Sequence, residues 1–166
     1  QWLLSMGAGV DQEDMRGFRR PGAFGLILNL FTSFGYFEDA LEDRRVAQNL
    51  CASLQPGGAL VMEMMGKEVL ARIFRERDWN RVGNLLVLEE RRVQRDWSWV
   101  GNRWTLIDGD RRVEVDLSHR LYSAAELAEL LRTAGFQSVA CFGDLGGSPY
   151  DQNALRLVAV ARRGPG

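Results

Sequence analysis

The sequence has 166 residues, which is enough for one domain with a hydrophobic core. A formal net charge of -1 excludes the strongly basic surface that nucleic acids or anionic membranes attract, so neither is an expected partner. Cys51 and Cys141 fall in separate predicted elements and indicate no disulfide framework. No apolar run approaches the roughly 20 residues of a membrane helix, and no signal peptide is recognisable. We therefore expect a reduced, cytoplasmic protein.

The first half of the chain predicts alternating strands and helices. Residues 24–31 form a continuous apolar run typical of a strand in a sheet covered on both faces. Residues 39–54 predict a helix with one apolar stripe, which the "QPGG" of residues 55–58 ends. A second strand over residues 59–65 and a helix over residues 67–75 follow. This order predicts an α/β fold with a parallel sheet.

The pattern changes over residues 85–121, where three stretches alternate polar and apolar residues. Gly101–Asn102 and Asp108–Gly109 separate these stretches, and both are hairpin turn signals. We expect an antiparallel insertion within a single domain of residues 1–166. Because polar and apolar residues alternate along these stretches, they do not fit strands that are buried on both faces.

The α/β pattern then resumes. Ser123 and Glu126 make a capping box at the start of a helix, and Gly135 ends that helix. Two strands, over residues 137–144 and 154–163, close the domain. The loop between them suits a hairpin, so we expect these two strands to be antiparallel.

Polar and aromatic residues follow the first buried strand, in "LNLFTSFGYF". In an open α/β sheet, ligands bind at the carboxyl ends of the strands. Asn29, Thr32 and Ser33 are able to hydrogen-bond a ligand there, while the aromatic rings pack on it. A hydrophobic turn that packs on the next helix is the alternative, and the pattern alone leaves both open.

His119 is the only histidine in the sequence. Metal sites built from several histidines are therefore excluded, and no metal ion is expected. A Ser–His–Asp site would have to use His119, and no serine is flanked by the glycines of a nucleophile elbow. His119 is expected to be a strand residue whose ring nitrogens have hydrogen-bond partners or, as the alternative, a catalytic base.

Taken together, several segments resemble class I S-adenosylmethionine-dependent methyltransferases. The resemblance covers about residues 10–163 and is carried by "EDMRGF", "FGLILNLF", "LQPGGALVMEM" and "SAAELAELLRTAGF". It implies a Rossmann-like sheet, S-adenosylmethionine as the cofactor, and methyl transfer to a small-molecule acceptor. Gly25 departs from the pattern, because the family usually has an aspartate there.

The resemblance also implies roles for individual residues. It places Asp14 and Met15 at the adenine, and Asn29, Leu30 and Phe31 at the methionine and methyl end of the cofactor. The insertion resembles a lid over the acceptor, although plain packing of a strand ribbon is the alternative. The residues expected toward the acceptor are Ser33, Gly35, Tyr36, Trp97, Trp99 and Trp104. The candidate proton acceptors are His119, Tyr36 and Glu63.

The family's first strand, glycine-rich loop and second strand have no room before Asp14. We therefore expect a methyltransferase sheet truncated at its N-terminus, with the strand of residues 26–30 left as an apolar edge that favours self-association. A non-catalytic module that binds a partner through this edge is the alternative function. A third hypothesis, an NAD- or nucleotide-binding domain built on Gly7 and Gly9, predicts an acidic residue about 20 positions later, where this strand lies.

Overall fold

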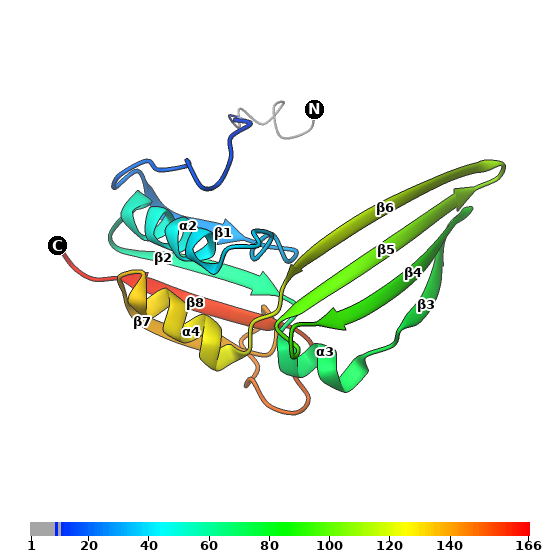
Figure 1. Ribbon diagram of the computed structural model, residues 1–166. Helices are drawn as coiled ribbons and strands as arrows, with labels where there is room; N and C mark the ends of the chain where they lie inside the picture. Colours follow the sequence, from blue (N-terminus) through cyan, green and yellow to red (C-terminus); the bar gives the residue numbers. More distant parts are fainter. Residues whose placement is uncertain (1–8, 10) are drawn as a thin grey trace.

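The computed structural model describes residue 9 and residues 11–166. Its strands form two four-stranded sheets, and Figure 1 shows the second sheet projecting away from the first. The first sheet belongs to an α/β body made of β1 (Phe24–Asn29), α2 (Ala40–Ser53), β2 (Leu54–Met64), α3 (Lys67–Ile73), α4 (Ala124–Thr133), β7 (Phe136–Phe142) and β8 (Leu157–Arg163). The second sheet consists of β3 (Arg77–Val82), β4 (Leu85–Gln94), β5 (Trp99–Asp108) and β6 (Arg111–Arg120).

The sheet of the body has the strand order β1-β2-β8-β7. β1 and β2 are parallel, whereas β8 is antiparallel to both of its neighbours. The predicted α/β class and the antiparallel pair of closing strands are therefore confirmed. The second sheet is antiparallel throughout, as expected of the insertion.

Helices α2 and α4 cover one face of this sheet. The predicted stripe on α2 is buried together with Leu127 and Leu131 of α4, and both pack on the inward side chains of β2 and β8. The capping box at Ser123 and Glu126 is present, so the predicted start of α4 is confirmed. Gly135 ends α4 with a φ of 112°, which a residue with a Cβ rarely adopts.

The β1 strand lies at the edge of the sheet, as expected. Leu26 and Leu28 alternate with the half-buried Ile27 and lie on the face away from the helices. They are 55% and 57% exposed, so within the described part of the chain this edge carries an uncovered apolar face.

Of the two predicted hairpin turns, the one at Asp108–Gly109 is confirmed and the one at Gly101–Asn102 was wrong. Gly101 and Asn102 lie inside β5, paired with both neighbouring strands, and the turn is at residues 95–98 instead. That turn contains no glycine, although Arg95, Asp96 and Trp97 all have positive φ. Ser98 stabilises it, because its backbone N–H and its hydroxyl both donate to the carbonyl oxygen of Arg95.

The remaining differences lie at the ends of elements. β2 begins at Leu54, so the expected turn over residues 55–58 is part of an irregular strand whose pairing shifts register between Phe24 and Leu26. The strand β3 was not predicted.

Of the two glycines in the nucleotide-binding hypothesis, Gly7 lies outside the described residues, and Gly9 is exposed. No helix in the described ranges is both long and apolar enough to cross a membrane.

Candidate functional site

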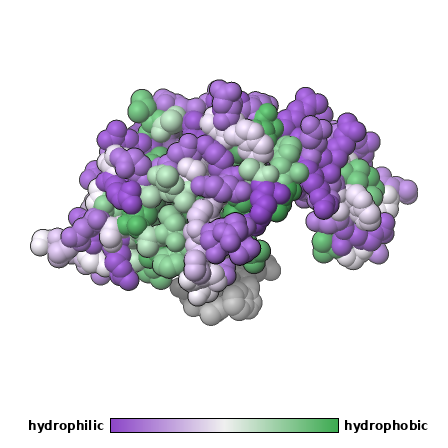
Figure 2. Space-filling view, turned by 90° about the horizontal axis from the view of Figure 1, so that it is seen from below, coloured by the Kyte–Doolittle hydropathy of each residue, from purple (hydrophilic) through white to green (hydrophobic). Residues whose placement is uncertain are grey.

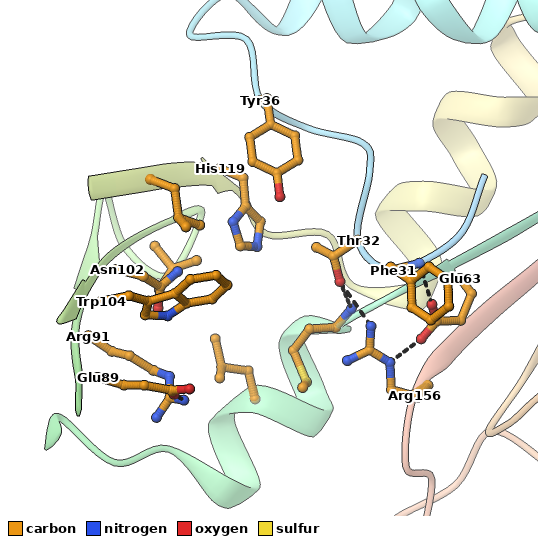
Figure 3. Close-up of a pocket in the computed structure, with 14 residues that line it drawn as sticks. Phe31, Thr32, Tyr36, Glu63, Glu89, Arg91, Asn102, Trp104, His119 and Arg156 are labelled. Carbon is orange, nitrogen blue, oxygen red and sulfur yellow. Dashed lines mark hydrogen bonds and ion pairs between the residues drawn. The ribbon is translucent and has the colours of Figure 1, made fainter. Parts of the chain in front are cut away.

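A cavity of about 460 Å³ lies between the carboxyl ends of β1 and β2 and the near end of the antiparallel sheet. Figure 3 shows its two walls, one formed by the loop after β1 and the other by side chains of β4, β5 and β6. The residues that line it are Phe31, Thr32, Tyr36, Glu63, Met65, Leu70, Glu89, Arg91, Val100, Asn102, Trp104, Leu117, His119 and Arg156.

Glu63 fixes the loop after β1. One of its carboxylate oxygens accepts a hydrogen bond from the backbone N–H of Phe31 at 2.7 Å, and the other pairs with the guanidinium of Arg156. Its carbonyl oxygen accepts from the N–H of Thr32 at 3.1 Å. Phe31 and Thr32 have φ values of 59° and 56°, a region that costs free energy without such support. The loop conformation therefore depends on a buried carboxylate of β2.

Thr32 connects the same network to the end of β2. Its hydroxyl oxygen accepts hydrogen bonds from the Arg156 guanidinium at 2.9 Å and from the backbone N–H of Met65 at 3.1 Å. Phe31, in contrast, is 86% exposed at the mouth of the cavity. A ring held outward on a fixed loop is available to contact a ligand.

Asn29 ends β1 and is buried. Its amide nitrogen donates to the carbonyl oxygen of Ser33 at 3.4 Å, but its side-chain oxygen has no hydrogen-bond partner among the described residues. The hydroxyl of Ser33 donates to the carbonyl oxygen of Leu30 at 2.6 Å. Asn29, Leu30 and Ser33 do not line the cavity, so the unpartnered Asn29 oxygen is buried behind the cavity wall, at a cost in free energy.

His119 and Tyr36 both line the cavity and pack against each other, with ring centroids 5.5 Å apart (Figure 3). His119 is 7% exposed, and within the described chain neither ring nitrogen has a hydrogen-bond partner, so the expectation of a satisfied ring was wrong. Burial lowers the pKa of His119, so its imidazole is neutral at pH 7. Burial raises the pKa of Tyr36, which keeps its phenol protonated.

The tryptophans of the antiparallel sheet have different environments. Trp104 points into the cavity, as Figure 3 shows. Trp99 is buried on the opposite side of the sheet, where the guanidinium groups of Arg95 and Arg120 lie 4.8 and 5.4 Å from its ring. The ring of Trp97 packs edge-on against Phe74. Of the three, only Trp104 lines the cavity.

Gly35 supports the cavity wall without lining it. Its carbonyl oxygen accepts from the N–H of Arg120 at 2.7 Å, and its φ is 93°. A Cβ at this position would lie 3.0 Å from the carbonyl oxygen of Arg120. Only glycine allows this close approach of the loop to β6.

Asp14 and Met15 lie in a turn before β1 and do not line the cavity. The Asp14 carboxylate forms an ion pair with Arg16 at 2.6 Å. Hydrogen bonds from the side chain and the backbone N–H of Arg16 lower the pKa of Asp14 to about 2. Asn49 of α2 holds the turn by donating to the carbonyl oxygen of Arg16 at 2.9 Å. Met15 packs against the core.

Sequence analysis did not find Arg156 or Asn102. Arg156 is 93 residues from its partner Glu63, and no local pattern marks an ion pair at that distance. Asn102 had a usable signal, because strand alternation places it on the same face as His119 once β5 is recognised as continuous. Among residue 9 and residues 11–166, no group of three or more acidic, histidine or cysteine side chains could hold a metal ion.

Solved structures with the same arrangement are S-adenosylmethionine-dependent methyltransferases. One from Clostridium acetobutylicum superimposes with a TM-score of 0.84 at 14% identity, over 98% of this chain and 68% of that one. The chain has the fold of class I methyltransferases. The methyltransferase CcbJ from Streptomyces caelestis superimposes with a TM-score of 0.76 at 16% identity, over 92% of this chain and 62% of CcbJ.

A third similar structure is S-adenosylmethionine-bound CalS10 from Micromonospora echinaspora, an amino pentose methyltransferase. Its TM-score is 0.61 at 23% identity, over 91% of this chain and 63% of CalS10. The chain thus spans less than two thirds of the length of CcbJ and of CalS10. Neither a protein-family model nor a curated protein sequence matches it. Identities this low establish the methyltransferase fold and not the activity.

Proposed function

We propose that this chain transfers a methyl group from S-adenosylmethionine to a small-molecule acceptor. The observation that carries the proposal is the position of the cavity, at the carboxyl ends of two parallel strands of a methyltransferase fold. CalS10, a similar structure, has S-adenosylmethionine bound. The antiparallel sheet closes the other side of this cavity, which suits a lid over an acceptor.

Residues at the end of β1 fit the cofactor. Asn29 would lie at the methionine and methyl end, where a shift of the loop after β1 would have to expose its buried, unpartnered oxygen to the amino group of the methionine moiety. Leu30 and Phe31 would line the same end, and Asp14 with Met15 would lie toward the adenine. When bound, S-adenosylmethionine supplies a methyl group activated by its sulfonium.

The acceptor would lie in the cavity, with Tyr36 lining the loop side and with Ser33 and Gly35 holding the loop behind it. The work of the chain is to align the acceptor and to exclude water, which methyl transfer from a sulfonium chiefly requires. Trp104 lines the cavity directly. Trp97 and Trp99 would act indirectly by holding the antiparallel sheet in place.

Among the three candidate proton acceptors, we favour His119. Its imidazole is neutral, faces the cavity and has both nitrogens unpartnered among the residues that the structure describes. Tyr36 keeps its proton. Both carboxylate oxygens of Glu63 are occupied by Phe31 and Arg156, so Glu63 is better suited to positioning the loop.

Calorimetric titration of the purified chain with S-adenosylhomocysteine tests the proposal. We expect micromolar binding, weakened at least tenfold by Asn29→Leu. Asn153→Leu, an exposed asparagine outside the cavity, is the matched control and leaves binding unchanged. A chain that is folded by circular dichroism but binds no cofactor would overturn the proposal and favour the non-catalytic binding module.

A further inference from the structure

The two faces of β6 differ in polarity. On the cavity side, His119 is followed toward the tip by Leu117, Val115 and Val113, which alternate along the strand. The opposite side carries only polar or charged side chains, which are Arg112, Glu114, Asp116, Ser118 and Arg120. Antiparallel sheets with this alternation normally cover their apolar face.

β5 and the outer part of β4 continue the same apolar face, whereas nearer the cavity β4 places Glu89 beside Trp104, where Glu89 forms an ion pair with Arg91. Val115 pairs with Trp104, and Val113 pairs with Leu106, which in turn pairs with Val87 of β4. We call these five residues the apolar stripe. Trp104, Val115 and Val113 are 37%, 39% and 49% exposed, so no part of the described chain fully covers them.

The apolar stripe continues directly from the cavity. Trp104 belongs to both, and the other members extend from it toward the projecting end of the sheet (Figure 1). Figure 2 shows the molecule hollowed between the α/β body and this projecting end. At the inner end, the only buried polar group without a partner on the sheet's cavity side is the imidazole of His119, among the described residues.

We propose that the acceptor is an elongated amphiphile, with a hydroxyl or amino head at His119 and an apolar body along the apolar stripe. A neutral imidazole offers one donor and one acceptor, which matches a hydroxyl or an amine. The six residue-to-residue steps from His119 to Val113 correspond to a length of about 20 Å along the strand. That the bound amphiphile is the methyl acceptor rests on the proposed function, whereas its binding to this surface does not.

A second copy of the chain is the competing occupant of the apolar stripe. A flat protein surface placed there would leave the imidazole of His119 at the inner end of the cavity without a partner, at a cost in free energy. A small molecule with a polar head and an apolar body would hydrogen-bond the imidazole and also cover the apolar stripe. This difference favours the amphiphile.

Titration calorimetry with 4-butyl-, 4-hexyl- and 4-octylphenol tests the apolar part of the proposal. We expect the affinity to rise about two- to fourfold for each added methylene that the stripe buries. Equal affinity for all three phenols would overturn the proposal. If sedimentation instead shows a dimer that Val115→Asn dissociates without changing phenol binding, the stripe is an interface between copies and the proposal fails.

A matched pair of variants on one strand locates the binding. Val115→Asn is expected to weaken the binding of 4-octylphenol at least fivefold and that of 4-butylphenol much less, because only the longer alkyl chain reaches the apolar stripe. Glu114→Asn, on the opposite face of β6, is expected to change neither. Equal effects of the two variants would contradict the proposal.

The head group is tested by comparing 4-butylphenol with its methyl ether, 4-butylanisole. Wild type is expected to prefer the phenol at least fivefold, and His119→Phe is expected to remove that preference while keeping the dependence on chain length. A preference unchanged in His119→Phe would overturn the assignment. Binding of alkylphenols by a chain that does not bind S-adenosylhomocysteine would refute the proposed function and leave this surface established.

Discussion

The guanidinium of Arg120 lies 3.0 Å from the carboxylate of Asp43, which joins β6 of the antiparallel sheet to α2 of the body. The hydroxyl of Tyr122 donates to the same carboxylate oxygen at 2.7 Å. Arg120 also donates to the carbonyl oxygen of Glu38 at 2.8 Å. Asp43 is fully buried, and burial raises its pKa while the hydrogen bonds from Tyr122 and Arg120 oppose that rise. This cluster connects the antiparallel sheet to α2 of the body.

Arg120→Leu should therefore be strongly destabilising. It leaves the buried carboxylate of Asp43 without its cation, and breaking such a pair costs about 3–5 kcal/mol. Urea unfolding measures the loss. Arg103→Leu, which breaks an exposed pair with Asp116 on the same sheet, is the control and should leave stability unchanged. The double variant Asp43→Leu/Arg120→Leu should recover much of the loss, and equal effects of the two single variants would contradict this account.

Glu63 should act on cofactor binding through the loop after β1. Glu63→Ala removes the acceptor for the Phe31 N–H and the partner of Arg156, so we expect about 2 kcal/mol less stability and at least tenfold weaker S-adenosylhomocysteine binding. Glu63→Gln keeps a neutral acceptor and should fall between alanine and wild type in calorimetry. Cofactor affinity that is insensitive to both variants would show that the loop is held in another way.

Gly35 should not tolerate a side chain. Gly35→Ala places a methyl group 3.0 Å from the carbonyl oxygen of Arg120 in a backbone region that alanine rarely adopts, and about 2 kcal/mol of stability should be lost. Gly109→Ala is the matched control, because Gly109 also has a positive φ but no atom within 4 Å of an added Cβ. Thermal unfolding should show the larger decrease for Gly35→Ala. Equal decreases would mean that backbone conformation alone accounts for both.

Local signals were enough to predict the α/β body. Ser123 and Glu126 mark the start of α4 through hydrogen bonds within a single turn, and Gly135 marks its end through one backbone angle. Part of the cavity rim was predictable for the same reason, because Phe31 and Thr32 come shortly after the apolar strand that Asn29 ends. Each of these features depends on residues that are close in the sequence.

The far wall of the cavity depended on register, which the sequence left ambiguous. Side chains alternate along a strand, so a turn placed at Gly101 rather than at residues 95–98 changes which tryptophans share a face. Trp104 faces the cavity and Trp99 faces away because β5 runs unbroken through Gly101. The contact between Glu63 and Arg156 was invisible in the sequence, since neither residue carries a local pattern that identifies its partner.

The exposed edge of β1 leads to a prediction about association. Leu26 and Leu28 present an apolar face on a strand whose outer backbone groups are unpaired within the described chain. We expect concentration-dependent self-association in sedimentation velocity, reduced by Leu28→Lys because a charge on an edge strand disfavours pairing. Leu145→Lys, at another exposed leucine away from β1, is the control. A monomer at all concentrations in wild type would refute the expectation.

His119 allows a direct test of the electrostatics of the cavity, because its single imidazole gives one resolved NMR titration. Burial lowers its pKa, so the midpoint should lie below the ordinary value of about 6.5. The charged and titratable groups that share the cavity with it are Tyr36, Glu63, Glu89, Arg91 and Arg156. A midpoint at or above 6.5 would mean that a carboxylate stabilises the imidazolium.

The same shift determines how stability depends on pH. The folded state binds a proton on His119 less readily than the unfolded state does. The contribution of neutral His119 to the free energy of unfolding is therefore fully present above about pH 6.5 and is lost as the pH falls through the folded pKa. Wild type should therefore lose stability relative to His119→Phe across that window. Methyl transfer that requires neutral His119 should decline over the lower part of it, near the NMR midpoint. A rate that stays constant through this midpoint would exclude His119 as the proton acceptor.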